Sequence, residues 1–146
     1  MKLTKIALPY MKSLSSLSEE TVMLTALNGR EATCLEKVES RKLIKLSLDG
    51  GINFPFYAGT SSKILLVYQK DSYIKQGYSF SDQEADPGAK ALGAPIFDHR
   101  GKIVAGLSIA GPRDRINEKN KVRLIRLLKE TVAKISQELG YTGSDA

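Results

Sequence analysis

The segment Gly59–Ser62 places three hydroxyl residues directly before a lysine, in the order Gly-Thr-Ser-Ser-Lys. Apolar residues between positions 64 and 68 predict a helix after this turn, so the turn would lie at a helix N-terminus, with free N–H groups and a positive dipole end. Such a site can bind a small anion, or the hydroxyls can simply cap the helix. A hydroxyl nucleophile with Lys63 as its base is not supported, because the Ser-x-x-Lys order is absent.

Two further reactive side chains, Cys34 and His99, favour structural interpretations. Cys34 lies in a strand pattern without a nearby histidine or activating charge, so we expect a small buried hydrophobe. His99 lies in a turn beside Asp98, where we expect it to be solvated. Because the Cys/His clusters of metal sites are absent too, we predict no catalytic residue, no metal and no cofactor, and therefore no enzyme.

The composition describes a globular chain of 146 residues with 42% hydrophobic residues, one cysteine and a net charge of +6. This length suffices for one domain, residues 1–146, with a core that needs no disulfide or structural metal. A single cysteine points to a reducing cytoplasm. We find no signal peptide and no apolar run of about 20 residues, so no membrane partner is expected. The basic balance admits nucleic acid, an anionic ligand or mere solubility.

The N-terminal half predicts a helix followed by strands. Apolar residues at three- and four-residue spacing predict a helix from Leu3 to Leu17, with Pro9 in its first turn or kinking it. Asn28-Gly29 then predicts a hairpin between strands 21–28 and 31–38. A further strand is expected at 43–48 and an extended segment at 54–57, where Pro55 disfavours helix.

The C-terminal half predicts strands at 78–81, 88–97 and 102–110, the last two joined by a turn at 98–101. A final helix, capped by Asn117, should end at Gly140. The predicted fold class is therefore α+β, with a mostly antiparallel sheet of about six strands and N-terminal, central and C-terminal helices. Small residues in the 88–110 hairpin leave room either for a ligand or for a packed helix.

Several sequence blocks occur in an order and spacing that together cover nearly the whole chain. They are Leu14–Val22, Leu35–Ser40, Ala58–Leu66, Gly77–Phe80, Gly93–Asp98, Gly101, Val104–Pro112 and Glu138–Tyr141. In this succession the chain resembles the effector-binding domain of the IclR family of transcription regulators. The resemblance implies a GAF/profilin-like fold, in which a curved antiparallel sheet carries helices on one side and a small-molecule pocket on the other.

The resemblance also implies a function and partners. Domains of this family bind small metabolites, often carboxylates, form homodimers or homotetramers, and adjust the DNA binding of an N-terminal winged helix-turn-helix domain. No helix-turn-helix pattern precedes Leu3, so we expect operator DNA to be reached only through a domain outside residues 1–146. The alternative is a stand-alone GAF-like interaction and dimerisation module with a vestigial pocket.

The effector-binding positions implied by the resemblance lie in the turn before the central helix and on three strands. They are Thr60, Ser61, Ser81, Ala89, Ala91, Ser108 and Ala110. The backbone amides of Thr60 and Ser61 would face the ligand. An acidic residue of the family falls on Ser81, a small polar one on Ala91 and a serine on Ala110, so only Ser108 keeps its expected chemistry. We expect a larger or more apolar acid as effector, or a pocket that has lost its ligand.

The chain also departs from the family pattern in length. Only residues 69–73 stand where further helical segments are expected, which indicates a deletion or a sequence joined across an unseen segment. The C-terminal helix carries a run of basic residues, Lys119, Lys121, Arg123, Arg126, Lys129 and Lys134. We expect either a solvated face or a face that contacts phosphates or a partner.

Overall fold

The computed structural model describes residues 2–28, 31–42, 53–55, 77–82 and 89–143. Its helices are α1 (Lys2–Ser18) and α3 (Lys121–Glu138), and its strands are β1 (Thr21–Asn28), β2 (Glu31–Val38), β3 (Asn53–Pro55), β4 (Ser79–Asp82), β5 (Ala89–Phe97) and β6 (Ile103–Pro112). The predicted strand at 43–48, the end of the extended segment at 56–57 and the predicted central helix lie outside the described residues.

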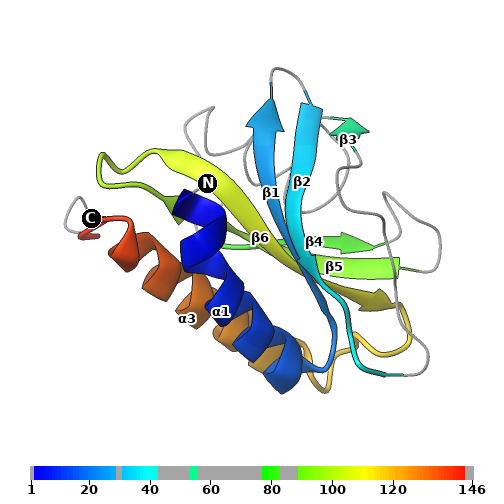
Figure 1. Cartoon of the computed structure of the whole chain (residues 1–146). Helices are drawn as coiled ribbons and strands as arrows, with labels where there is room; N and C mark the ends of the chain where they lie inside the picture. Colours follow the sequence, from blue (N-terminus) through cyan, green and yellow to red (C-terminus); the bar gives the residue numbers. More distant parts are fainter. Residues whose placement is uncertain (1, 29–30, 43–52, 56–76, 83–88, 144–146) are drawn as a thin grey trace.

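The six strands form one sheet in the order β3-β2-β1-β6-β5-β4, with every neighbouring pair antiparallel. Helices α1 and α3 lie side by side along one face of this sheet, drawn in blue and orange in Figure 1. The predicted α+β class, the antiparallel sheet of about six strands and the two terminal helices are therefore confirmed. Neither described helix combines the length and the hydropathy needed to cross a membrane.

The β1–β2 hairpin is confirmed with the predicted strand bounds, and its register changes once along its length. Asn28 pairs with Glu31, and the register runs regularly to the pair Thr25 and Cys34. The next pair is Leu24 with Glu36, so Leu35 is an extra residue in a β-bulge. Because side chains alternate along a strand, the bulge reverses the face to which the rest of β2 points.

The hydrophobic core lies between the sheet and the two helices. Most of its large fully buried members come from α1 and α3 and from alternate positions of three central strands: Met11, Leu14, Leu124, Leu128, Ile135, Val22, Leu24, Leu92, Ile96, Leu107 and Ile109. Ile116, in the segment between β6 and α3, adds one more. Pro9 lies well inside α1 rather than in its first turn, with an exposed ring. The same apolar periodicity that predicts each helix therefore also supplies the layer that holds it on the sheet.

The start of α3 differs from the prediction. The N-cap residue is Asn120 rather than Asn117, and its side chain makes no capping bond. Instead, Asn120 Nδ2 donates to the carbonyl of Arg115 at 2.6 Å, and Asn117 Oδ1 accepts the N–H of Lys119 at 2.9 Å. Both amides stabilise the turns before the helix. The predicted end is confirmed, since Gly140 has a φ of +94° after the last helical turn.

A buried ion pair joins the entry of β1 to the segment after β6. Arg115 donates from Nε and Nη2 to the two carboxylate oxygens of Glu20 at 2.8 and 2.7 Å, and Glu20 is only 3% exposed. This bond raises the pKa of the Arg115 guanidinium. Gly111 permits the arrangement, because a Cβ there would lie 2.5 Å from Glu20 Oε1. The charges are thus paired in a bidentate geometry inside the fold.

Candidate functional site

The sheet has a second face, which points away from α1 and α3 and which we call the site face. It carries Thr21, Met23, Thr25, Cys34, Ala91, Ser108 and Ala110. Met23, Cys34 and Ala110 form a small buried apolar cluster with Ala91 packed against it, separate from the main core. The site face is therefore apolar around a few polar positions, whereas the centre of the other face consists of fully buried apolar side chains.

Four of the predicted effector-binding positions meet on neighbouring strands. Ser81 pairs with Ala91, Ala91 with Ala110, and Ala110 with Thr21, which makes one row across four strands. Ala89 lies two positions from Ala91 and so on the same face. The structure brings these positions together as neighbours. Thr60 and Ser61 lie outside the described residues.

Ser108 lies in the adjacent row, beside Met23 on β1 and Gly93 on β5. The residue is 2% exposed, and its hydroxyl oxygen has no hydrogen-bond partner in the described structure. A buried hydroxyl normally has such a partner, because it loses its bonds to water on burial. Ser108 is thus an unsatisfied polar group on the face that the resemblance assigns to the effector.

The small residues of the β5–β6 hairpin divide between the two faces. Ala94 and Ala105 are fully buried in the core under the helices, whereas Ala91 and Ala110 belong to the cluster on the site face. Close packing of the helices accounts for the first pair. The second pair lies on the face where the ligand explanation remains a prediction.

Lys37 is a candidate that the sequence analysis missed. The register places it opposite Met23, in the row that contains Ser108. Its Nζ lies 3.0 Å from a carboxylate oxygen of Glu39, and its side chain is 16% exposed. A regular hairpin would turn Lys37 towards the helices, and only the bulge at Leu35 brings it to the site face. No local pattern in the sequence signals that bulge.

Cys34 is buried, as predicted, at 5% exposure. Its thiol lies 3.4 Å from the carbonyl oxygen of Glu36, a weak donor contact. The surrounding cluster is apolar, with Met23 and Ala110 beside it. These contacts fit the predicted packing role for this thiol.

His99 is exposed in the β5–β6 turn, as predicted. The neighbouring Asp98 carboxylate accepts bonds from the side chain of Arg100 and from the backbone N–H groups of Arg100 and Lys102. The Arg100 bond, together with the backbone bonds, lowers the pKa of Asp98 to about 2. These hydrogen bonds stabilise the turn, and they give a structural role to Asp98 next to His99.

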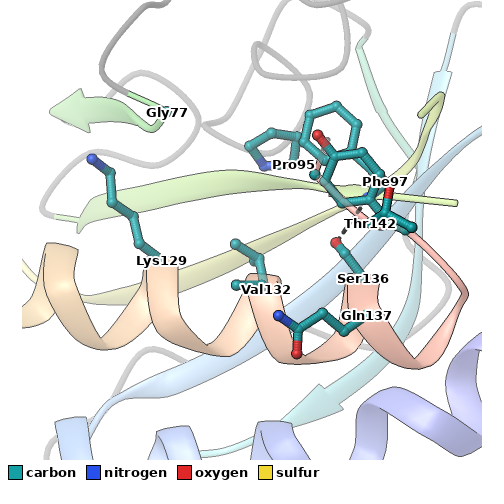
Figure 2. Close-up of a pocket in the computed structure, with 11 residues that line it drawn as sticks. Gly77, Pro95, Phe97, Lys129, Val132, Ser136, Gln137 and Thr142 are labelled. Atoms are coloured by element: carbon teal, nitrogen blue, oxygen red, sulfur yellow. Dashed lines mark hydrogen bonds between the residues drawn. The ribbon is translucent and has the colours of Figure 1, made fainter. Parts of the chain in front are cut away.

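A pocket of about 320 Å³ lies elsewhere, between α3 and the end of β5. Phe97 stacks on Tyr141 with ring centroids 4.8 Å apart, and the N–H of Phe97 donates to Ser136 Oγ at 3.0 Å. Figure 2 shows Lys129 extending from α3 towards Gly77 at the opposite end. Of the predicted effector-binding residues that the structure describes, none lines this pocket. Its contacts fasten the end of α3 to β5.

Metal chemistry has no support in the part of the chain that the structure describes, where no three His, Cys, Asp or Glu side chains come together as a possible ligand set.

The sequence matches the family described as "Bacterial transcriptional regulator IclR C-terminal", over residues 1–76 and 71–137. It is 30% identical to the HTH-type transcriptional regulator KipR of Bacillus subtilis, over 97% of this chain and 69% of that protein. It is 25% identical to the regulator KdgR of Dickeya chrysanthemi, over 90% of this chain and 53% of the relative. The chain thus spans between half and about two thirds of these relatives, which are transcriptional regulators and not enzymes.

Solved structures give the same assignment. The C-terminal domain of Escherichia coli KdgR has a TM-score of 0.83 and 25% identity, and covers 97% of this chain and 100% of that domain. The Thermotoga maritima IclR structure has a TM-score of 0.85 and 27% identity, over 97% of this chain and 70% of its own. Both likenesses cover nearly the whole chain, 97% of it in each case.

The comparisons also bear on the expected deletion. The alignment with KipR runs over 173 positions for 97% of the 146 residues, so about thirty positions of that relative have no counterpart. The two family matches meet at residues 71–76, in the segment where the sequence departs from the family in length.

With the family match over most of the chain, the curated relatives and the shared fold in agreement, this protein belongs to the IclR family of bacterial transcriptional regulators and corresponds to its C-terminal domain.

Proposed function

We propose that this domain senses a small carboxylic acid on the site face and passes the bound state to the rest of a transcription regulator. Ser108 is the observation that carries the proposal. Within the described part of the chain its buried hydroxyl has no partner, and an unsatisfied buried polar group costs about 1–3 kcal/mol. A ligand oxygen that accepts a hydrogen bond from the Ser108 hydroxyl would recover this energy. The ligand would thereby complete the fold.

The surroundings of Ser108 favour an acid with an apolar body. Ala91, Ala110, Met23 and Cys34 offer carbon and sulfur surfaces, and none of them offers a strong hydrogen bond. The carboxylate would bind the backbone amides of Thr60 and Ser61, with Ser81 and Ala89 at the edge of the site. Lys37 adds a cation to the row, although Glu39 already neutralises it in part.

We further propose that the domain assembles into a homodimer or homotetramer and acts in the cytoplasm on operator DNA through a separate helix-turn-helix domain. Support comes from the relatives, which are HTH-type regulators and extend well beyond the region they share with this chain. Light scattering of the 146-residue chain tests the assembly. A monomer at micromolar concentration would contradict this part of the proposal.

The ligand is tested by thermal unfolding of the chain with a panel of 2-oxo acids, branched acids and aromatic acids. A ligand at 100 times its Kd stabilises the native state by about 2.7 kcal/mol. For a domain of this size such stabilisation raises Tm by about 5–10 °C. Ser108→Ala should abolish or strongly reduce the shift. The control Ser16→Ala, at an exposed position of α1, should keep it.

An absence of any shift across the panel, with a sample that unfolds cooperatively, would contradict effector sensing. If that sample is also dimeric, the result supports the interaction module with a vestigial pocket. A shift that survives in Ser108→Ala would place the ligand away from the site face.

A further inference from the structure

We propose that the outer surface of α1 and α3, which we call the basic layer, contacts the phosphate backbone of duplex DNA. The net charge of the chain is +6. Helix α1 carries three lysines and no acidic residue, and α3 carries five basic residues against Glu130 and Glu138. The two helices therefore hold the entire net charge, and all other residues together balance to zero.

Most of these cations are free to meet a partner. Lys2, Lys5, Lys12, Arg126 and Lys134 are exposed. None of the ion pairs within the described segments includes a cation of α1 or α3. The ion pairs of those segments lie instead in the strands and turns. The positive charge of the basic layer is therefore not cancelled locally.

The other cations of α3 already have partners on the protein. Arg123 donates to the carbonyl of Leu17 at 2.9 Å, and Lys121 lies 4.1 Å above the ring of Phe80. Of the two acidic residues of α3, Glu138 accepts a hydrogen bond from Tyr10 on α1. These contacts fix the two helices against each other and against β4, so that the free cations project from a rigid surface.

The geometry of the basic layer suits a long polyanion. The helices have 17 and 18 residues and lie side by side (Figure 1), so the surface is about 26 Å long at 1.5 Å per residue. Along one DNA strand the phosphates are about 3.4 Å apart in axial rise, so several can face the layer at once. Lys5 and Lys12, seven residues apart, form one stripe along α1.

Duplex DNA is favoured over a membrane or a docked helix. The large exposed apolar side chains in the described residues are Leu17 and Val122, both near one end of the layer, so the rest of the surface offers charge without an apolar stripe. The relatives of the chain are HTH-type transcriptional regulators. A domain tethered to a DNA reader stays close to phosphates, where even weak contacts gain from high effective concentration.

The test measures binding of a fluorescent 20-base-pair duplex of arbitrary sequence by anisotropy, over a series of NaCl concentrations. If three or four phosphates are neutralised, log K should fall with log[NaCl] at a slope of about −3 to −4. The triple variant Lys5→Gln, Lys12→Gln, Arg126→Gln should bind at least 10-fold more weakly at 50 mM salt. Its slope should be shallower by about three.

The matched control removes three charges outside the layer, with Arg41→Gln, Lys102→Gln and Arg113→Gln, all at exposed positions. It should bind within about 3-fold of the unmodified chain with an unchanged slope, since exposed phosphate contacts act locally. Circular dichroism confirms that both variants fold. Equal weakening by the two variants, or no binding by the unmodified chain at 50 mM salt, would overturn the proposal. So would tighter binding to vesicles with 30% anionic lipid than to the duplex.

Discussion

The two faces of the central sheet use buried residues in opposite ways. On the helix side, Leu24, Leu92, Leu107 and Ile109 are fully buried against two helices, and the charged group at the edge, Glu20, is bonded through both oxygens. On the site face, small residues surround Ser108, whose buried hydroxyl has no partner in the described structure. In the described structure the buried charge of the helix side is paired, whereas the buried hydroxyl of the site face is not.

This difference separates stability from binding within a single sheet. A strand sends alternate residues to the two faces, so Leu107 and Ser108 are chain neighbours with opposite roles. Apolar burial on the helix side contributes most of the folding free energy. The site face can therefore carry an unsatisfied group at a cost that the fold tolerates.

The largest loss of stability is expected when the ion pair between Glu20 and Arg115 on the helix side is broken. Glu20→Ala leaves Arg115 partly buried without its partner, which should lower the free energy of unfolding by about 3–5 kcal/mol. Urea unfolding followed by circular dichroism measures the change. The neighbouring Glu19→Gln, at an exposed side chain, should change stability by less than about 0.5 kcal/mol. Similar losses in both variants would show that the Glu20–Arg115 ion pair contributes no more to stability than an exposed carboxylate does.

A cavity in the apolar part of the helix side should cost nearly as much. Leu107→Ala removes a fully buried side chain and is expected to destabilise the domain by about 2–5 kcal/mol. The same urea experiment checks it. Leu17→Ala, at a side chain that is 51% exposed, is the control and should stay within about 1 kcal/mol. A tolerated Leu107→Ala would mean that this face is packed loosely.

A smaller, pH-dependent effect on stability is expected at the β5–β6 turn, which belongs to neither face of the sheet. There the Asp98 carboxylate accepts hydrogen bonds from Arg100 and Lys102. Its pKa is lowered from 3.8 to about 2. The carboxylate therefore stabilises the fold above about pH 4, and this contribution disappears as pH falls towards 2. Asp98→Asn should be less stable than the unmodified chain at pH 7, and the difference should shrink between pH 4 and pH 2. Urea midpoints at pH 7, 4 and 2.5 test this, and a constant difference would contradict it.

The smallest effect on stability should come from the site face. Ser108→Ala removes a hydroxyl that has no partner among the described residues, so without ligand the free energy of unfolding should stay within about 0.5 kcal/mol or rise slightly. The same variant is expected to lose the ligand response, which gives the sharpest contrast with Leu107→Ala. A destabilisation above about 1 kcal/mol would show that the hydroxyl is bonded in the native state.

Much of the fold was predictable because its signals are local. The apolar spacing of residues 3–17 and 122–139 gives both helices, Asn28-Gly29 gives the hairpin and Gly140 the helix end. The predicted N-cap at Asn117 was wrong. Two asparagines three residues apart compete for the N-cap position, and the side chain of Asn120 donates a hydrogen bond to the carbonyl of Arg115. The shared face of Ser108 and Ala110 was also predictable, because residues two apart on a strand point to the same side.

The sequence by itself determined the family, the α+β class and the residues that share a face of each strand, since these depend on short-range spacing and on the order of blocks. The tertiary structure decided which strands adjoin, and so which residues share a row. The bulge at Leu35 turns Lys37 towards the site face, and burial leaves Ser108 without a partner in the described structure. The first depends on how β1 and β2 pair and the second on how β6 packs between β1 and β5, and no local pattern encodes either.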